Sequence, residues 1–129
     1  MRAGADGISM INTLLGMVID VNTMKPYLSQ KTGGLSGPAI RPVAVRAIYQ
    51  VRERLPKTPI IGMGGVRTGR DAFELVLAGA NAVSVGTASF SNPLAPLKVR
   101  DELQALMIDK GFTRFEDAVS YAHRKVSGE

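Results

Sequence analysis

The stretch PIIGMGGVRTGRDAFELVLAGANAVSVGTA, Pro59–Ala88, contains two apolar segments that each end on glycine. PIIGMGG begins the stretch and AVSVGTA ends it, and the residues between them are long enough for one helix. A continuous apolar run is typical of a parallel strand that is buried on both faces. Glycine after such a strand lets backbone N–H groups approach an anion closely. The stretch therefore predicts strands over Pro59–Met63 and Ala82–Val85, with a phosphate site where they end.

A helix is predicted between these two strands. Thr68, with Asp71 three residues later, forms an N-terminal cap for a helix over Gly69–Leu77, and Gly79 ends it.

Further helices are predicted on either side of this unit. Apolar residues at helical spacing indicate one helix over Arg41–Leu55 and another from about Pro93 or Leu97 to Lys110. A capping box predicts a last helix, with its apolar stripe continuing towards the end of the chain. The box is Thr113 with Glu116, and the stripe is Phe115, Val119, Ala122 and Val126.

A third strand is predicted near the beginning of the chain, over Gly7–Ile11. Its surroundings repeat those of the last strand, because AGADGISMIN at Ala3–Asn12 aligns with AGANAVSVGT at Ala78–Thr87. Each copy places Ala-Gly-Ala before an apolar strand and a small or polar residue after it. The long segment that follows, Leu14–Pro38, is rich in glycine and polar residues, and we expect a loop with a small hairpin around Val18–Asp20 and Pro26–Leu28.

The alternation of strands and helices favours an α/β fold with a parallel sheet and right-handed crossovers. In a (β/α)8 barrel, the loops after the last two strands form the usual phosphate site, but a complete barrel needs about 250 residues. The chain has 129. We therefore expect residues 1–129 to form one partial domain, the carboxyl-terminal part of such a barrel, about strands 6 to 8. Open sheet edges should favour self-association or assembly with the missing part.

Composition excludes several classes of function. There is no cysteine, which excludes disulfides, thiolate metal sites and a cysteine nucleophile within this sequence. The net charge of +5 comes from scattered Lys and Arg with few aromatic residues, so no nucleic-acid interface is expected. No apolar run approaches the roughly 18 residues of a membrane span, and we expect a soluble, cytoplasmic protein.

His123 is interpreted as a solvated surface residue, whereas Arg67 follows the glycine pair closely enough to lie near a phosphate.

Four segments together resemble the last part of dihydroorotate dehydrogenase, most closely the class 1B catalytic subunit. Each glycine motif alone is weak, but the order and spacing of all four are specific, and the resemblance covers essentially the whole chain. The segments are INTLLGMVID (Ile11–Asp20), KTGGLSGPAIRPVAVRAIYQV (Lys31–Val51), PIIGMGGV (Pro59–Val66) and VGTASF (Val85–Phe90).

The resemblance implies an enzyme that oxidises dihydroorotate to orotate with flavin mononucleotide (FMN) in pyrimidine synthesis. It implies a partner subunit carrying an iron-sulfur centre and FAD, in a heterotetramer that passes electrons to NAD. In the family a cysteine base and a flavin-contacting lysine lie upstream of the matched region, so this chain has no catalytic residue of its own. The carried-over sites are Asn12 and Thr13 for the pyrimidine, Ile11 and Gly37 beside the flavin, and Gly64, Gly65, Gly86 and Thr87 at its phosphate. No metal ligand is implied.

The residue chemistry agrees with this assignment without requiring it. The Asn12 amide both donates and accepts, which suits a pyrimidine edge, and Thr13 adds a hydroxyl. Asn12 and Thr13 also suit a simple loop cap, and Gly64 and Gly65 suit a tight turn. Two other functions therefore stay open: a related barrel acting on a sugar phosphate, and a non-catalytic half-barrel that binds phosphate or flavin.

Overall fold

A three-stranded parallel sheet forms the centre of the computed structural model, which describes residues 3–124. Its order is β1 (Ile8–Met10), β6 (Ile60–Gly62) and β7 (Ala82–Val83), so the central strand pairs with both neighbours. The register places Gly62 beside Met10 on one side and Val83 on the other. All three predicted strands are confirmed, although each is shorter than its apolar run.

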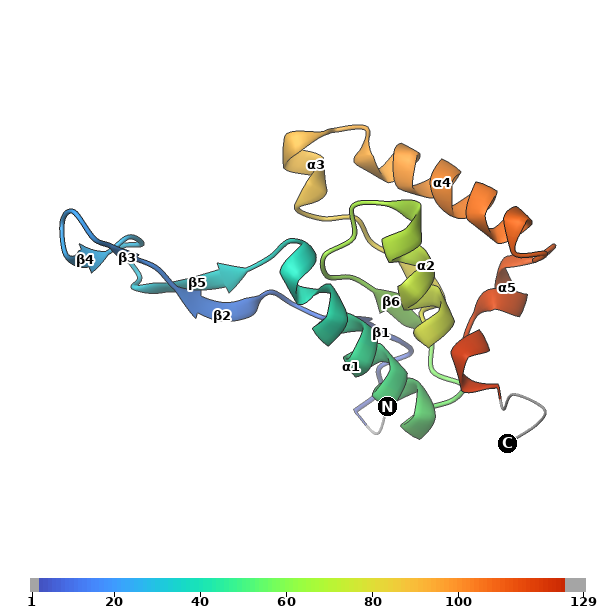
Figure 1. The fold of residues 1–129 in the computed structure, drawn as a ribbon. Coiled ribbons are helices and arrows are strands. Elements are labelled where there is room, and N and C mark those ends of the chain that lie inside the picture. The colour runs from blue at the N-terminus through green and yellow to red at the C-terminus, as the bar shows by residue number, and fades with distance from the viewer. Residues whose placement is uncertain (1–2, 125–129) are drawn as a thin grey trace.

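Three long helices pack around this sheet. They are α1 (Arg41–Arg54), α2 (Gly69–Ala78) and α4 (Ala95–Asp109), and α2 lies between the other two (Figure 1). The predicted cap of α2 is confirmed, because the Thr68 hydroxyl accepts the N–H of Asp71 in a capping box. The short elements η1 (Pro38–Ile40), α3 (Ala88–Ser91), α5 (Phe115–Ala118) and η2 (Tyr121–His123) complete the body.

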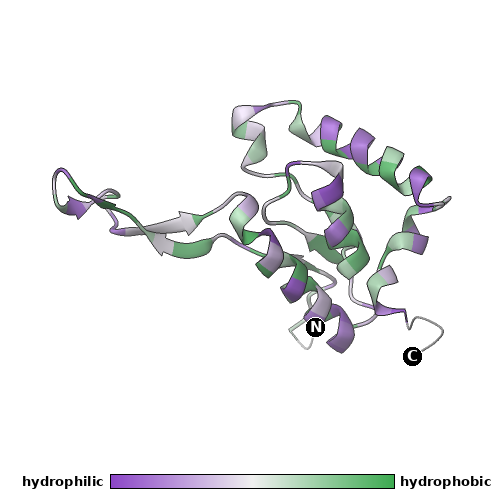
Figure 2. Cartoon of the chain, viewed as in Figure 1, coloured by the Kyte–Doolittle hydropathy of each residue, from purple (hydrophilic) through white to green (hydrophobic). Residues whose placement is uncertain are grey.

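The core lies between the sheet and the helices. Its largest fully buried side chains are Ile48 of α1, Ile60 of β6, and Leu75 and Val76 of α2. Figure 2 shows hydrophobic residues on the central strands, with hydrophobic and hydrophilic residues alternating along α1 and α4. This alternation is expected of helices that bury one face and expose the other. No helix within residues 3–124 is long and apolar enough to cross a membrane.

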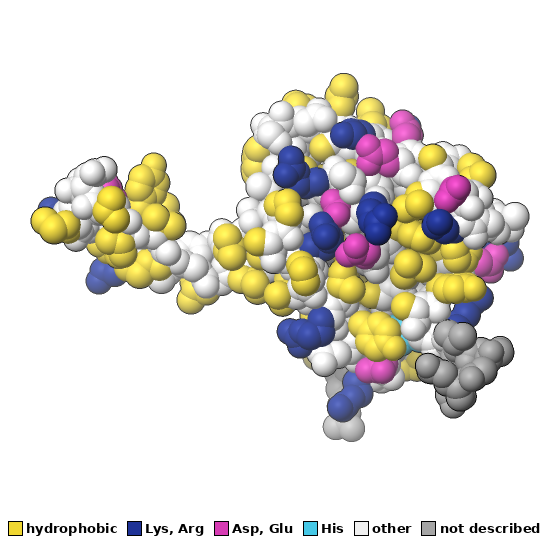
Figure 3. Space-filling view, viewed as in Figure 1, with side chains coloured by type: hydrophobic (Ala, Val, Ile, Leu, Met, Phe, Trp, Pro, Cys, Tyr) yellow, Lys and Arg dark blue, Asp and Glu magenta, His cyan; other side chains and the backbone are white. Residues whose placement is uncertain are grey.

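The segment predicted as a long loop forms a two-stranded arm that projects from the body (Figures 1 and 3). Strand β2 (Leu14–Met17) pairs antiparallel with β5 (Thr32–Leu35), and β3 (Ile19–Asp20) pairs with β4 (Lys25–Pro26). The predicted hairpin is therefore present at the tip of a longer ribbon.

Side chains of the arm are unusually apolar for an exposed ribbon. Leu15 and Val21 are each 82% exposed, and Met24 is 84% exposed. In the turn at the tip, the N–H of Asn22 donates to the Asp20 carboxylate at 2.9 Å, and this hydrogen bond lowers the Asp20 pKa.

The carboxyl-terminal prediction is wrong in two respects. Helix α5 starts after Arg114 with no side-chain cap and ends at Ala118, so Thr113 and Glu116 form no capping box. Ser120 then has φ of 62°, and the chain continues as the short helix η2. Phe115 and Val119 do pack against the core, as the stripe predicted, but Ala122 is exposed because the chain has left the helix before it, and Val126 lies outside the described residues.

His123 is also not a solvated residue. Its ring stacks on Tyr49 of α1 with centroids 3.9 Å apart, and its Nε2 lies 2.9 Å from the carbonyl oxygen of Ala78. Because a carbonyl oxygen only accepts, Nε2 carries the proton. His123 thus fastens the end of the described chain to the ends of α1 and α2.

Arg52 joins the ends of α1 and α2, and it has no acidic partner among the residues that the structure describes. It is 6% exposed, and its guanidinium donates to the carbonyl oxygens of Gly79, Pro56 and Thr58 and to the Asn81 side chain, at 2.6–3.1 Å. Burial lowers the pKa of Arg52, but an arginine stays charged in a folded protein. The charge is stabilised here by oriented carbonyl dipoles.

We expect Arg52→Met to lower the free energy of unfolding by about 2 to 4 kcal/mol, because several buried carbonyl groups lose their donor. Arg46→Met on the same helix is the matched control, since Arg46 is exposed and bonds only to Gln50 in the described part of the chain. Urea unfolding followed by circular dichroism measures both variants. Equal midpoints for the two would contradict this account of Arg52.

Candidate functional site

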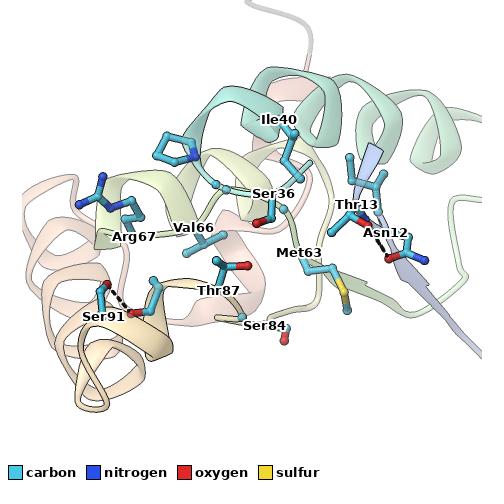
Figure 4. A pocket seen from close by; sticks show the side chains of 17 residues that line it. Asn12, Thr13, Ser36, Ile40, Met63, Val66, Arg67, Ser84, Thr87 and Ser91 are labelled. Carbon is cyan, nitrogen blue, oxygen red and sulfur yellow. Dashed lines mark hydrogen bonds between the residues drawn. The ribbon is translucent and has the colours of Figure 1, made fainter. Parts of the chain in front are cut away.

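A cavity of about 440 Å³ opens beyond the carboxyl ends of the three parallel strands (Figure 4). Its walls come from the segment after β1, the turn before α1, the turn after β6, the turn after β7 and helix α3. All eight residues singled out from the sequence line it. They are Ile11, Asn12, Thr13, Gly37, Gly64, Gly65, Gly86 and Thr87.

Backbone hydrogen bonds between the strands bring these segments together. Beyond the last paired residues, the N–H of Met63 donates to Met10 at 2.8 Å, and the N–H of Ile11 donates to Met63 at 3.0 Å. On the other side, the N–H of Ser84 donates to Gly62 at 2.8 Å. The three strands therefore end level with each other, as expected of parallel strands in one sheet.

The turn after β6 requires glycine. Gly65 has φ of 76°, and a Cβ there would lie 2.8 Å from the Gly37 carbonyl oxygen and 2.9 Å from the Arg41 Cβ. Gly64 has φ of 120°, and its Cβ would lie 3.1 Å from Ile11 Cγ1. Positive φ and close packing each disfavour a side chain. The tight-turn interpretation of this glycine pair is thus confirmed, and the turn also forms the cavity wall.

Backbone donors are available on this wall. Among the described residues, no backbone-to-backbone hydrogen bond uses the N–H groups of Gly64, Gly65, Gly86 or Thr87. A Cβ at Gly86 would meet nothing within 4 Å, so that turn faces open space. Exposed N–H groups in glycine turns are typical of anion-binding sites.

Arg67 gives the cavity a positive charge. The Arg67 side chain is exposed, and among the described residues that line the cavity it is the one charged side chain. None of the ion pairs between residues 3 and 124 involves it. The sequence placed it near a phosphate because it follows the glycine pair. In the structure it lines the cavity, and Figure 4 shows its side chain beside Val66, away from Asn12 and Thr13.

Asn12 and Thr13 form the opposite end of the cavity. The Asn12 Oδ1 accepts the N–H of Thr13 at 2.8 Å, so the Asn12 amide retains its two N–H donors for a ligand. A Cβ on Gly34 would overlap the Thr13 hydroxyl, so Gly34 of the arm leaves the space that Thr13 fills. The loop-cap interpretation of Asn12 is partly right, because the same side chain also faces the cavity.

Sequence reasoning missed several lining residues. Ser36, Ser84 and Ser91 bring hydroxyl groups to the cavity, while Pro38, Ile40 and Met63 bring apolar surface. Ser84 and Met63 are recognisable from the sequence as positions just past the paired residues of a strand. The others belong to turns whose direction depends on packing. No cluster of side chains suited to a metal ion occurs in residues 3–124.

We expect Gly65→Ala to lower the free energy of unfolding by about 2 kcal/mol or more, because its Cβ would press on backbone at positive φ. Gly86→Ala should change it by less than about 0.5 kcal/mol, since its Cβ meets open space. Chemical denaturation of both variants checks this contrast. A Gly65→Ala protein as stable as the parent chain would refute the described packing of the turn.

Comparison with known proteins identifies the family. Residues 1–107 match the family model of dihydroorotate dehydrogenase. Over 122 residues the chain is 54% identical to a putative dihydroorotate dehydrogenase A (fumarate) of Aquifex aeolicus, covering 94% of this chain and 40% of that protein. It is 52% identical over 118 residues to the catalytic subunit of dihydroorotate dehydrogenase B (NAD(+)) of Oceanobacillus iheyensis, covering 92% and 38%.

Solved structures agree. The crystal structure of the dihydroorotate dehydrogenase of Eimeria tenella in complex with ferulenol superposes with a TM-score of 0.79 at 28% identity. It covers 96% of this chain and 33% of that one. The chain thus spans about 40% of the length of the curated relatives it matches, in accord with the expected partial barrel. It belongs to the dihydroorotate dehydrogenase family.

Proposed function

We propose that this chain forms the FMN-phosphate and pyrimidine-binding part of a dihydroorotate dehydrogenase, which oxidises dihydroorotate to orotate in pyrimidine biosynthesis. The observation that carries the proposal is the single cavity lined by all eight residues that the resemblance assigned to flavin or substrate. Its volume of about 440 Å³ lies within the range of small-molecule pockets.

FMN suits the two halves of this cavity. The phosphate fits the glycine wall, where the N–H groups of Gly64, Gly65, Gly86 and Thr87 make no backbone-to-backbone hydrogen bond among the described residues and Arg67 lines the same cavity. The ring system fits the apolar wall of Ile11, Pro38, Ile40 and Met63. Hydrogen bonds from N–H groups and a guanidinium to a phosphate are charge-assisted and therefore strong.

Held by the glycine wall and the apolar wall, a bound FMN would supply the hydride acceptor for the oxidation of dihydroorotate, because a flavin is the redox group of such a site. The chain's own contribution is orientation. The Asn12 amide donates to carbonyl or carboxylate oxygens of the pyrimidine, and the Thr13 hydroxyl adds a second contact. In the family the catalytic base is a cysteine, and these 129 residues contain none. We therefore assign proton removal to a residue outside them.

The proposal extends to the electron acceptor. A relative named for NAD(+) and one named for fumarate are 52% and 54% identical to this chain. We favour the NAD route, with an iron-sulfur and FAD partner subunit, because the four resembling segments are most similar to the class 1B catalytic subunit. The proposed location is the cytoplasm.

We expect the chain to bind FMN about tenfold or more tightly than riboflavin, because riboflavin lacks the phosphate that the glycine wall binds. Flavin fluorescence quenching measures both affinities. Ribose 5-phosphate should bind more weakly than FMN, because it leaves the apolar wall uncovered. Equal affinity for FMN and riboflavin would contradict the phosphate assignment, and tighter binding of the sugar phosphate would favour a sugar-phosphate barrel.

Arg67→Gln should weaken FMN binding by roughly threefold, as expected for one exposed ion pair, and should reduce its salt dependence. The matched control is Arg70→Gln, because Arg70 is exposed on α2 and does not line the cavity. Equal affinities in the two variants would show that the Arg67 charge does not contact the phosphate.

Dihydroorotate oxidation should be undetectable with the 129-residue chain alone, even with FMN, because no residue in it serves as the catalytic base. An assay of dihydroorotate-dependent dye reduction tests this, with a full-length relative as the positive control. Turnover by the purified chain would show that another group in it removes the proton.

A further inference from the structure

Arg41 stands at the first position of α1 and reaches across to the start of α2. Its NH1 donates to Asp71 Oδ1 at 2.5 Å, and its Nε donates to Glu74 Oε2 at 3.1 Å. The Asp71 side chain is 11% exposed, that of Arg41 28% and that of Glu74 41%, so the pair with Asp71 is partly shielded from water and the pair with Glu74 is not. A guanidinium that binds two carboxylates holds the elements that carry them in a defined relative position.

Asp71 in turn holds the end of the glycine turn. Its Oδ2 accepts the N–H groups of Arg67 and Thr68, each at 2.9 Å. One carboxylate therefore connects Arg41 to the segment that immediately follows Gly64, Gly65 and Val66.

Arg41 also touches the middle of the same turn. The Cβ position of Gly65 lies 2.9 Å from Arg41 Cβ and 3.0 Å from Arg41 N. Gly65 of the turn therefore packs on the Arg41 backbone. The Arg67 and Thr68 N–H groups bond to Asp71, which in turn accepts from the Arg41 guanidinium. Arg41 itself does not line the cavity.

We infer that Arg41 is a positioning residue for phosphate binding: through Asp71 it holds the Arg67 and Thr68 end of the turn, and so orients the N–H groups of Gly64 and Gly65 towards the cavity. The inference rests on the proposed function, since the phosphate is that of FMN. It also has an electrostatic part. Without Arg41, the carboxylates of Asp71 and Glu74 lose their cation beside a site that binds a dianion.

The test compares FMN with riboflavin in the full 129-residue chain. Arg41→Met should weaken FMN binding by about tenfold while riboflavin affinity changes by less than about twofold, so the ratio of the two affinities falls. Arg41→Lys should restore part of the ratio, because lysine keeps the charge but not the forked geometry. Arg46→Met, on the same helix and away from the cavity, should leave the ratio unchanged.

A second measurement does not depend on flavin. Hydrogen exchange of the Arg67 and Thr68 amides should accelerate about tenfold or more in Arg41→Met, because their acceptor is no longer held, while exchange in the middle of α4 stays unchanged. An unchanged affinity ratio, or unchanged exchange at both amides, would overturn the role of Arg41. If the parent chain itself does not distinguish FMN from riboflavin, the proposed function fails, and the exchange measurement still decides whether Arg41 orders the turn.

Discussion

Pairing of β6 on both of its edges is the constraint on which the rest of the structure depends. The strand is bonded to β1 and β7, so the three segments that follow these strands emerge at one edge of the sheet. The position also leaves no room above the strand, because a Cβ on Gly62 would lie 2.8 Å from the Ala80 Cβ and 3.0 Å from the Ile48 Cδ1. Because Gly62 has no side chain, Ile48 of α1 and Ala80 pack directly on the end of β6, just before the turn that lines the cavity.

Two arginines of α1 bind α2, one near each end of the helix pair. One forms an ion pair and the other donates to carbonyl oxygens. At the amino-terminal ends, Arg41 pairs with the Asp71 carboxylate, close to the cavity. At the carboxyl-terminal ends, Arg52 binds the Gly79 carbonyl oxygen and the neighbouring loop. The two helices therefore run in the same direction with both ends tied, which gives the glycine turn between β6 and α2 a rigid base. Rigid support of this kind is what precise ligand binding requires.

Local patterns in the sequence predicted those features that depend on residues close together in the chain. Glycines after apolar runs predicted the strand ends, and Thr68 with Asp71 predicted the start of α2, because both depend on residues close together in the chain. The repeat of Ala3–Asn12 in Ala78–Thr87 placed a small or polar residue after each strand, and the residues that end the two copies, Asn12 and Thr87, both line the cavity.

Where the prediction failed, distant residues decide the structure. His123 was interpreted as solvated because its neighbours in sequence are polar, yet Tyr49 and Ala78 cover it. Asp71 was recognised as a cap, but its ion pair with Arg41 depends on how α1 packs against α2. Thr113 and Glu116 have the right spacing for a capping box, but the helix starts one residue later and ends at Ala118, and just after it the Ser120 N–H donates to the Val76 carbonyl oxygen of α2. Contacts of this kind join residues that are far apart in the sequence, so local spacing does not predict them.

We expect the glycine turns of this cavity to bind the FMN phosphate while Asn12 and Thr13 face the pyrimidine. A crystal structure of the protein with FMN and orotate would show both contacts at once. We predict phosphate oxygens within hydrogen-bonding distance of the N–H groups of Gly64, Gly65, Gly86 and Thr87, with orotate at the Asn12 amide. A flavin bound elsewhere, or one whose phosphate points away from both glycine turns, would contradict the account.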